Sequence, residues 1–380
     1  MALFVNYFYF IMFRIFKYLT LVGLFCLAGV ANAQVNLAVI APTSGESAQI
    51  GKEIVDGVRA AVDEINQTGG LLGEKVNLLP IEDMCDNSLS LSTAQMLALN
   101  KETEYKASAV IGPYCFNQYQ AVTDTFAKAG IFQIIPTAVS ANYAQNGHSG
   151  LVKMVGYQDQ QAKDFFDFYS KHFQSLRVAL ISDAQHQDIA HALQQIFIQN
   201  NQQDNLISYS FEDYQFDYGK LTDVVLENRT QLAFILGDAE SANQMARKLK
   251  IEDSKQIIFL NRYQVAPEFE ILMGDLAENC YLMGLPSLKD SPEFAETLVK
   301  LRLLGIEPEG LAVYGYSAAK LWAELVKKSG SFAYDKLAKT LQGASFNSGW
   351  GRLMFTNGNP VNTLHYSIYQ YKDGEYAQVY

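Results

Sequence analysis

The sequence predicts an α/β fold of two lobes, each built on a parallel sheet with helices on both faces. Short, continuously apolar segments alternate with amphipathic ones along almost the whole chain. Continuous apolar strands separated by helices indicate parallel sheets buried on both sides. These strands are too many for one ordinary sheet. Removal of a 33-residue leader would leave 347 of the 380 residues, a length that suits two domains.

The N-terminus has the features of an export signal. Arg14 and Lys17 precede the apolar run Leu19–Val30, and Ala31-Asn32-Ala33 matches a small-x-small cleavage site. The run holds about a dozen residues, whereas a bilayer span needs about 20. We expect a signal peptide over residues 1–33, cleavage after Ala33 and a periplasmic protein. Because Met1–Phe13 is also aromatic and apolar, an uncleaved membrane anchor is the alternative.

The first unit after the leader is a strand, a helix and a second strand. Val35–Ile40 is apolar and ends at Pro42, and the helix after Gly51 is closed by Gly69-Gly70. That helix carries an apolar face of Ile54, Val58, Ala61, Val62 and Ile65. Further strands are expected at Val76–Ile81, Ala107–Ile111, Ile131–Ile135, Leu151–Val155, Val178–Ile181, Leu232–Leu236, Ile257–Leu260 and Cys280–Gly284. Helices are expected at Ala121–Ala129, Gln161–Phe173, Ile189–Gln199 and Ser241–Lys250.

Changes in pattern suggest where the chain passes between lobes. A strand gives way to a new helix near Gly156-Tyr157, and a return fits near Gly284-Leu285-Pro286. The segment Trp350–Tyr380 reads as antiparallel strands joined by tight turns, laid on one sheet edge. The expected N-terminal lobe is therefore 34–156 plus 286–350, and the C-terminal lobe is 157–285 plus 351–380.

Charge and motif content exclude several functions. The net charge is −11, and it becomes −13 without the two basic residues of the leader, which argues against nucleic acid or an anionic membrane as partner. His186 and His191 lie near Asp183 and Asp188, but a spacing of five places the histidines on different helical faces. No nucleophile motif accompanies them, and no Cys/His metal spacing occurs. We expect no enzymatic activity, no cofactor and no metal.

Three cysteines remain after the leader. Cys85 and Cys115 each follow a predicted strand, and the ends of neighbouring parallel strands lie close together, so these two are the expected disulfide. Cys280 falls in an apolar strand, where a buried, inert thiol is expected.

Four polar loops are candidates for a ligand site. Ligands of open α/β sheets bind beyond the carboxyl ends of the strands, where free N–H groups of helix N-termini favour anionic or carbonyl groups. The loops are Pro42–Gly51, Gly112–Tyr119, Pro136–Asn142 and Asp183–Asp188. Their Ser, Thr, Asn and Gly residues would also serve as ordinary helix caps and turns.

At this point the chain resembles a known family. The matching segments, in order, are Asp56-Gly57 with Ala60–Asn66 and Thr68-Gly69-Gly70, Glu82–Asp86, Val110–Cys115, Ala129–Ile131 leading to Ile135-Pro136, and Arg177–Asp183. In order and spacing they resemble the branched-chain amino-acid-binding type of periplasmic solute-binding protein, the extracytoplasmic receptor of ABC importers. The resemblance covers essentially the whole mature chain. It implies a bilobal type I fold with three hinge crossings, a cleft that closes on ligand and a disulfide at Cys85 and Cys115.

The ligand positions of that family carry over poorly. In the first lobe Phe116 stands where the family has a hydroxyl for the ligand carboxylate, and Ile50 replaces an aromatic. Thr137 and Val139 stand where the family has a small residue and a threonine. Backbone N–H groups of the loops that contain Asn117 and Ser140 would still hold an anion.

The second lobe also departs from the family. Gln187 and Ala239 occupy positions of two tyrosines, and Arg262 lies near the position of the acid that pairs with the ligand ammonium. Because a buried ammonium needs a partner, Arg262 in the cleft would repel an amino acid and attract a carboxylate; alternatively, it points to solvent. A leucine or valine ligand is therefore not expected, and a carboxylate, a neutral amide-like ligand and an aromatic one remain open.

Two functions follow from the resemblance. The leading hypothesis is a periplasmic receptor that closes around one small molecule and delivers it to the membrane permease of an ABC importer. The alternative is a ligand-sensing regulatory subunit on the same fold that signals to a membrane partner. Co-purification with a permease or with a signalling protein would separate the two.

Overall fold

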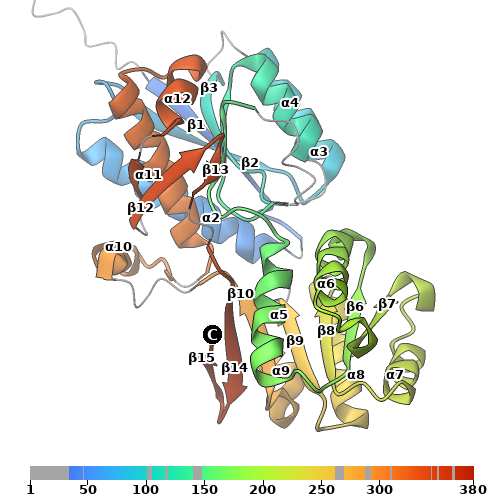
Figure 1. The fold of residues 1–380 in the computed structure, drawn as a ribbon. Helices are drawn as coiled ribbons and strands as arrows, with labels where there is room; N and C mark the ends of the chain where they lie inside the picture. Colours follow the sequence, from blue (N-terminus) through green and yellow to red (C-terminus); the bar gives the residue numbers. More distant parts are fainter. Residues whose placement is uncertain are drawn as a thin grey trace, which may run out of the picture.

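A computed structural model describes residues 34–45, 47–100, 105–115, 119–139, 148–261, 269–286, 292–308, 310–343, 345–348, 351–361 and 364–380. The described chain forms two lobes, each with a central sheet and helices around it (Figure 1). This arrangement confirms the α/β prediction with parallel sheets.

The N-terminal lobe contains a five-stranded parallel sheet in the order β2-β1-β3-β4-β5. Its strands are β1 (Gln34–Ala41), β2 (Lys75–Glu82), β3 (Ala107–Ile111), β4 (Phe132–Ile135) and β5 (Leu151–Lys153). Its helices are α2 (Ala48–Gln67), α3 (Asn87–Leu99), α4 (Tyr119–Ala129), α11 (Ala312–Ser329) and α12 (Tyr334–Leu341). The helix α10 (Ala295–Leu303) follows the second passage between the lobes.

Strand β1 shows why this sheet is covered on both faces. Successive side chains of a strand point to opposite faces. Leu37 and Val39 accordingly belong to the core that contains α2 and α11, while Ala38 and Ile40 belong to the core under α3 and α4. A continuously apolar strand is therefore buried throughout.

Two glycines let helices α2 and α11 pack with their backbones in close approach. A Cβ atom on Gly57 would lie 1.8 Å from the Ala312 carbonyl oxygen, and one on Gly315 would lie 2.4 Å from the Ile54 carbonyl oxygen. Only glycine fits at either contact.

The C-terminal lobe contains a seven-stranded sheet in the order β15-β14-β10-β9-β8-β6-β7. Its strands are β6 (Val178–Ser182), β7 (Leu206–Ser210), β8 (Leu232–Leu236), β9 (Ile257–Asn261), β10 (Cys280–Gly284), β14 (Ser367–Lys372) and β15 (Glu375–Gln378). Strands β14 and β15 are antiparallel and close one edge, as predicted for the end of the chain.

The helices of this lobe pack on an aromatic core. They are α5 (Gln160–His172), α6 (Gln187–Gln199), α7 (Tyr218–Glu227), α8 (Ala239–Glu252) and α9 (Phe269–Met273). Short 3-10 turns lie at Ala184–His186, Gln203–Asn205, Glu212–Tyr214, Gly274–Ala277 and Pro292–Phe294. Phe165 of α5 stacks on Phe234 with ring centroids 4.4 Å apart, and Phe259 stacks on Tyr281 at 4.6 Å. Such aromatic pairs add about 0.5–1.5 kcal/mol beyond their buried area.

The chain passes between the lobes three times, and the third passage differs from the expected boundary. A small antiparallel sheet of β11 (Ser345–Ser348), β12 (Gly351–Thr356) and β13 (Asn359–Pro360) lies on the N-terminal lobe, where the Lys153 N–H donates to the Gly358 carbonyl at 2.9 Å (Figure 1). Its apolar side chains Phe346, Leu353 and Phe355 are buried there. This corrects the expected boundary at residue 351, because only the segment from β14 onward joins the sheet of the C-terminal lobe.

Candidate functional site

A cavity lies where the two lobes meet, at the carboxyl ends of their parallel strands. It has a volume of about 40 Å³. It is lined by Tyr114, Thr137, Ala138, Gln158, Gln161, His186, Ile189, Asn261, Leu285, Leu311 and Tyr366. Both lobes contribute, which is the arrangement expected of a ligand site in open α/β folds.

Each passage between the lobes supplies one wall residue. Gln158 lies in the first, Leu285 in the second and Tyr366 in the third. The first is tied to the N-terminal lobe, because the Gln158 N–H donates to the Val139 carbonyl at 2.8 Å. The cavity is therefore bounded by the segments that set the angle between the lobes.

Two buried polar groups of the wall lack a hydrogen-bond partner among the described residues. They are the hydroxyl of Thr137, from the N-terminal lobe, and the Nε2 amide of Gln161, from α5. Asn261 Nδ2 donates to Gln161 Oε1 at 3.4 Å, which leaves the amide nitrogen as the end of Gln161 available to a ligand. Leaving such a group unsatisfied costs about 1–3 kcal/mol.

His186 lines the cavity from the C-terminal lobe and is paired with Asp183. The imidazole Nδ1 lies 2.6 Å from Asp183 Oδ1, and the two side chains are 11% and 9% exposed. The same carboxylate oxygen accepts the backbone N–H groups of Gln185 and His186 and so caps the short turn after β6. Asp183 is thus engaged within the protein.

The two tyrosines of the wall remain protonated. Burial raises the pKa of the Tyr114 phenol, and the nearby Glu53 carboxylate adds to the shift. Burial likewise raises the pKa of Tyr366, with further contributions from Asp164 and Asp159. Both phenols can therefore donate hydrogen bonds at neutral pH.

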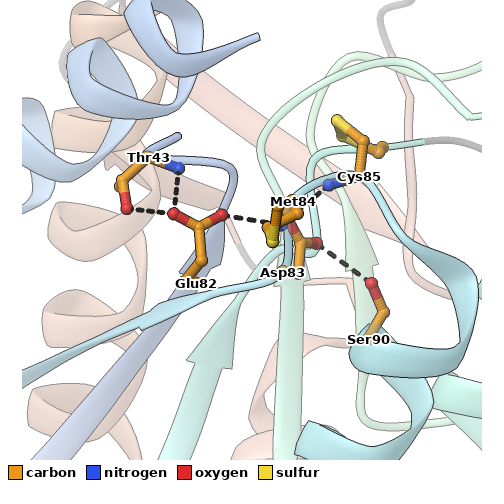
Figure 2. The surroundings of a disulfide bond; sticks show 7 residues. Thr43, Glu82, Asp83, Met84, Cys85 and Ser90 are labelled. Atoms are coloured by element: carbon orange, nitrogen blue, oxygen red, sulfur yellow. Dashed lines mark hydrogen bonds between the residues drawn. A yellow bond between two sulfur atoms is a disulfide. The ribbon is translucent and has the colours of Figure 1, made fainter. Parts of the chain in front are cut away.

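A disulfide holds the loop that carries Tyr114. Cys85 and Cys115 are joined, as the sequence predicts. Figure 2 shows the turn that carries the other cysteine of this disulfide, Cys85. There Asp83 is fully buried and accepts the Cys85 N–H at 3.2 Å and the Ser90 hydroxyl at 3.1 Å, and burial raises the pKa of Asp83.

The neighbouring carboxylate, Glu82, fastens the first loop of the chain to the same turn. It accepts the Thr43 N–H at 2.8 Å and the Met84 N–H at 2.6 Å (Figure 2). Burial acts to raise the pKa of Glu82, but these hydrogen bonds and those from the Thr43 and Ser44 hydroxyls prevail and lower it. Met84 and Cys85 both have positive φ angles in this turn, which these contacts hold in place.

The predicted site residues do not all come together. Thr137 lies in the cavity wall, and Val139 is fully buried beside it, paired with Tyr157. Ile50 instead packs on the core from the first turn of α2. Gln187 donates to Ser182 Oγ and to the Asp183 carbonyl, and Ala239 begins α8; none of these three lines the cavity. Phe116, Asn117, Ser140 and Arg262 lie outside the described residues.

Most of the wall was not anticipated from the sequence. The loop interpretation does point to the segments of Tyr114, Thr137 and His186. No local motif marks four further wall residues: Gln161, Asn261, Leu311 and Tyr366. They come together only because the chain passes between the lobes three times. Within the described part of the chain, no group of His, Cys, Asp and Glu side chains is arranged to hold a metal, and no helix is long and apolar enough to span a bilayer.

Comparisons with known proteins agree with the fold. A family model described as periplasmic binding protein matches residues 34–202. The chain is 24% identical to the Leu/Ile/Val-binding protein BraC3 of Rhizobium johnstonii, over 94% of this chain and 96% of the relative. It is 23% identical to an amino acid binding protein of Pseudomonas aeruginosa, over 92% of this chain and 93% of the relative.

Solved structures show the same architecture. The leucine binding protein LivK of Thermotoga maritima has a TM-score of 0.73 at 18% identity, covering 90% of this chain and 97% of its own. A solute binding protein of R. palustris, solved in complex with benzoate, has a TM-score of 0.72 at 18% identity, covering 91% of this chain and 96% of its own. The family match over residues 34–202 and the full-length relatives show that the chain is similar to periplasmic binding proteins, including Leu/Ile/Val-binding proteins, and the solved structures show that it has the type I fold.

Proposed function

We propose that this protein is an extracytoplasmic receptor that closes its lobes around one small solute and delivers it to an ABC importer. The observation that carries the proposal is the cavity between the lobes, whose wall includes one residue from each of the three passages. A ligand that contacts all three acts directly on the angle between the lobes, so binding favours the closed arrangement.

The relatives indicate the size and chemistry of the solute. These proteins are named for leucine, isoleucine and valine or for amino acids in general, and one was solved in complex with benzoate. All of these are small molecules with a carboxylate, and leucine, isoleucine, valine and benzoate also have an apolar body. The present cavity combines apolar walls, from Ala138, Ile189, Leu285 and Leu311, with polar groups. We therefore propose an amino-acid-like, amide or carboxylate solute of similar size.

Entry of such a solute requires the lobes to separate. Typical small-molecule pockets enclose roughly 300–1,000 Å³. The cavity of about 40 Å³ is far smaller than this. Opening at the three passages would enlarge it, and closure would then exclude water from the bound solute.

The proposal includes export and a membrane partner. Cleavage after Ala33 would release a chain that begins at Gln34, the first residue of β1. Intact-mass measurement of the protein from a periplasmic extract tests this step, since a mass that retains residues 1–33 would contradict cleavage. Affinity capture from membranes should recover an ABC permease; recovery of a membrane kinase or cyclase instead would contradict the transport role.

Small-angle scattering combined with a thermal-shift screen tests binding and closure. The chain from Gln34 is screened against amino acids, amides, short carboxylates and aromatics, and a solute at one hundred times its dissociation constant should stabilise it by about 2.7 kcal/mol. The same solute should reduce the radius of gyration. Ala138→Phe, which fills the cavity, should abolish both effects, and Ile251→Phe, at an exposed position, should leave them intact. A solute that binds without changing the radius of gyration, or that binds Ala138→Phe equally well, would contradict the proposal.

A further inference from the structure

We infer that the cavity recognises an uncharged carbonyl or carboxamide group, held between Thr137 of one lobe and Gln161 of the other. This inference specifies the ligand class of the site proposed above and rests on that proposed function. It starts from the two buried polar groups that have no partner among the described residues, the Thr137 hydroxyl and the Gln161 amide nitrogen.

The two groups offer hydrogen-bond donors to the same cavity from opposite sides. Thr137 is 3% exposed and Gln161 is 1% exposed, and both line the cavity. The Gln161 amide has a defined orientation, because its oxygen accepts from Asn261 Nδ2. Its NH₂ group therefore requires an acceptor. A carbonyl oxygen between this NH₂ and the Thr137 hydroxyl would satisfy both and connect the two lobes.

The charges around the cavity favour a neutral acceptor over a carboxylate. The titratable groups among the described wall residues are two phenols and one imidazole, and the imidazole is paired with Asp183. Carboxylates lie just behind the wall. Glu53 accepts the Leu311 N–H at 3.0 Å, and Asp164 accepts the Tyr366 N–H at 2.6 Å. An anionic ligand would lose hydration close to these carboxylates, which is costly unless a cation compensates it.

Glu53, Asp164 and Asp183 are not among the residues that line the cavity, so they do not provide a site for an ammonium group there. Oδ1 of Asp183 accepts two backbone N–H groups and lies 2.6 Å from His186 Nδ1. Asp164 has no exposed surface and accepts from Gln160, His365 and Tyr366. The polar groups that line the cavity are a hydroxyl, phenols, amides and the imidazole of His186, which is paired with Asp183, and an amide-type ligand can hydrogen-bond to them without bringing a charge.

Four probes with similar branched apolar bodies and different head groups test the ligand class by calorimetry. They are 4-methylpentanamide, which is neutral; 4-methylpentanoate, an anion; 3-methylbutylamine, a cation; and leucine, a zwitterion. The amide should bind at least about tenfold more tightly than each of the others. Preference for the acid, for the amine or for leucine would overturn the inference, as would failure of all four to bind.

Substitutions at the two donors test the contacts. Gln161→Glu replaces the NH₂ donor by an acceptor and should weaken amide binding by about 10- to 100-fold while improving binding of the amine. Thr137→Val keeps the shape and should weaken amide binding by about 2- to 10-fold. Gln194→Glu, at a half-buried position of α6 that contacts Ser208 and does not line the cavity, introduces the same charge into the same lobe and should leave affinity unchanged. Equal amide affinities for Gln161→Glu and Gln194→Glu would overturn the inference.

Failure of this inference and failure of the proposed function give different results. If another solute without a carbonyl group reduces the radius of gyration, the receptor function stands and the assigned ligand class is wrong. If the amide binds with the expected sensitivity to Gln161→Glu but no change in the radius of gyration accompanies binding, the site assignment stands and the proposed closure is wrong.

Discussion

Asp164 connects the first helix of the C-terminal lobe to the third passage between the lobes. Its carboxylate is fully buried on α5. Oδ2 accepts the Tyr366 N–H at 2.6 Å, while Oδ1 accepts from Gln160 Nε2 at 2.9 Å and lies 2.8 Å from His365 Nδ1. We predict that Asp164→Ala destabilises the protein and frees the segment that places Tyr366 in the cavity wall.

The expected loss in the free energy of unfolding depends on which hydrogen-bond partners of Asp164 can bond to solvent instead. The His365 side chain is 66% exposed, so its lost contact with Asp164 is largely replaced by solvent. The Tyr366 N–H lies in a buried residue and is left without an acceptor. A hydrogen bond to a charged group contributes about 1.5–3 kcal/mol. With the weaker bond from Gln160, Asp164→Ala should lower the free energy of unfolding by about 2–4 kcal/mol.

Urea unfolding of the chain from Gln34 measures this effect. Asp164→Asn keeps an oxygen for the Tyr366 N–H and should lose only about 1–2 kcal/mol. Asp223→Ala removes an exposed carboxylate of α7 in the same lobe and should stay within about 0.5 kcal/mol of the wild type. If Asp164→Ala is no less stable than Asp223→Ala, the anchoring role assigned to Asp164 is refuted.

Three further predictions concern the chain from Gln34. Replacing Cys85 and Cys115 together by serine should lower the free energy of unfolding by about 3–4 kcal/mol, because the disulfide closes a 30-residue loop; a loss below about 1 kcal/mol in urea would contradict this. Ellman's reagent should detect no thiol in the folded protein and one in denaturant, since Cys280 is buried and burial raises its pKa to about 12; a reactive thiol in the folded protein would contradict its burial. Burial lowers the pKa of Lys153 from 10.5 to about 8. Between these pH values the unfolded state binds one proton more than the folded state. The free energy of unfolding therefore rises as the pH increases from about 8 to 10.5, by at most about 3 kcal/mol. Below pH 8 both states are protonated, and Lys153→Met should be more stable there and lack the rise; an equal rise in the variant would exclude Lys153 as its source.

The sheets were predictable because their strands are buried on both faces. Val178–Ser182 and Leu232–Leu236 are buried along their whole length, so each can be identified in the sequence as a short run of apolar residues. Strand β7 (Leu206–Ser210) was not predicted. It forms the edge of the sheet, is only partly buried and contains two serines, so it shows neither a continuous apolar run nor a clear alternation.

The sequence-based prediction misplaced the third passage between the lobes for a related reason. The segment after Trp350 reads as consecutive antiparallel strands, which suggests a single unit on one edge. Burial of Leu353 and Phe355 on the N-terminal lobe separates β12 and β13 from the strands that follow. Local turn signals predict the antiparallel pairing of β14 and β15, but they contain no information on which lobe receives each strand.

The candidate site was less predictable than the fold because its wall is assembled from distant parts of the chain. Transferring a ligand position from the family assumes that the corresponding loop directs the corresponding residue into the cavity. Gln187 shows the limit of that assumption, since its side chain is held by Ser182 and the Asp183 carbonyl while the preceding residue, His186, lines the cavity. A shift of one residue at a helix N-terminus turns the side chain by about 100°.

The position of the wall residues explains how ligand specificity can change while the fold stays the same. Thr137 and Gln161 lie on opposite lobes, and the Thr137 hydroxyl and the Gln161 amide nitrogen make no hydrogen bond among the described residues. Leu285 and Tyr366 instead lie in the passages and are held by the surrounding structure, as the bond from the Tyr366 N–H to Asp164 shows. On the proposed function, closure would act through Leu285 and Tyr366, and the choice of ligand would depend on Thr137 and Gln161.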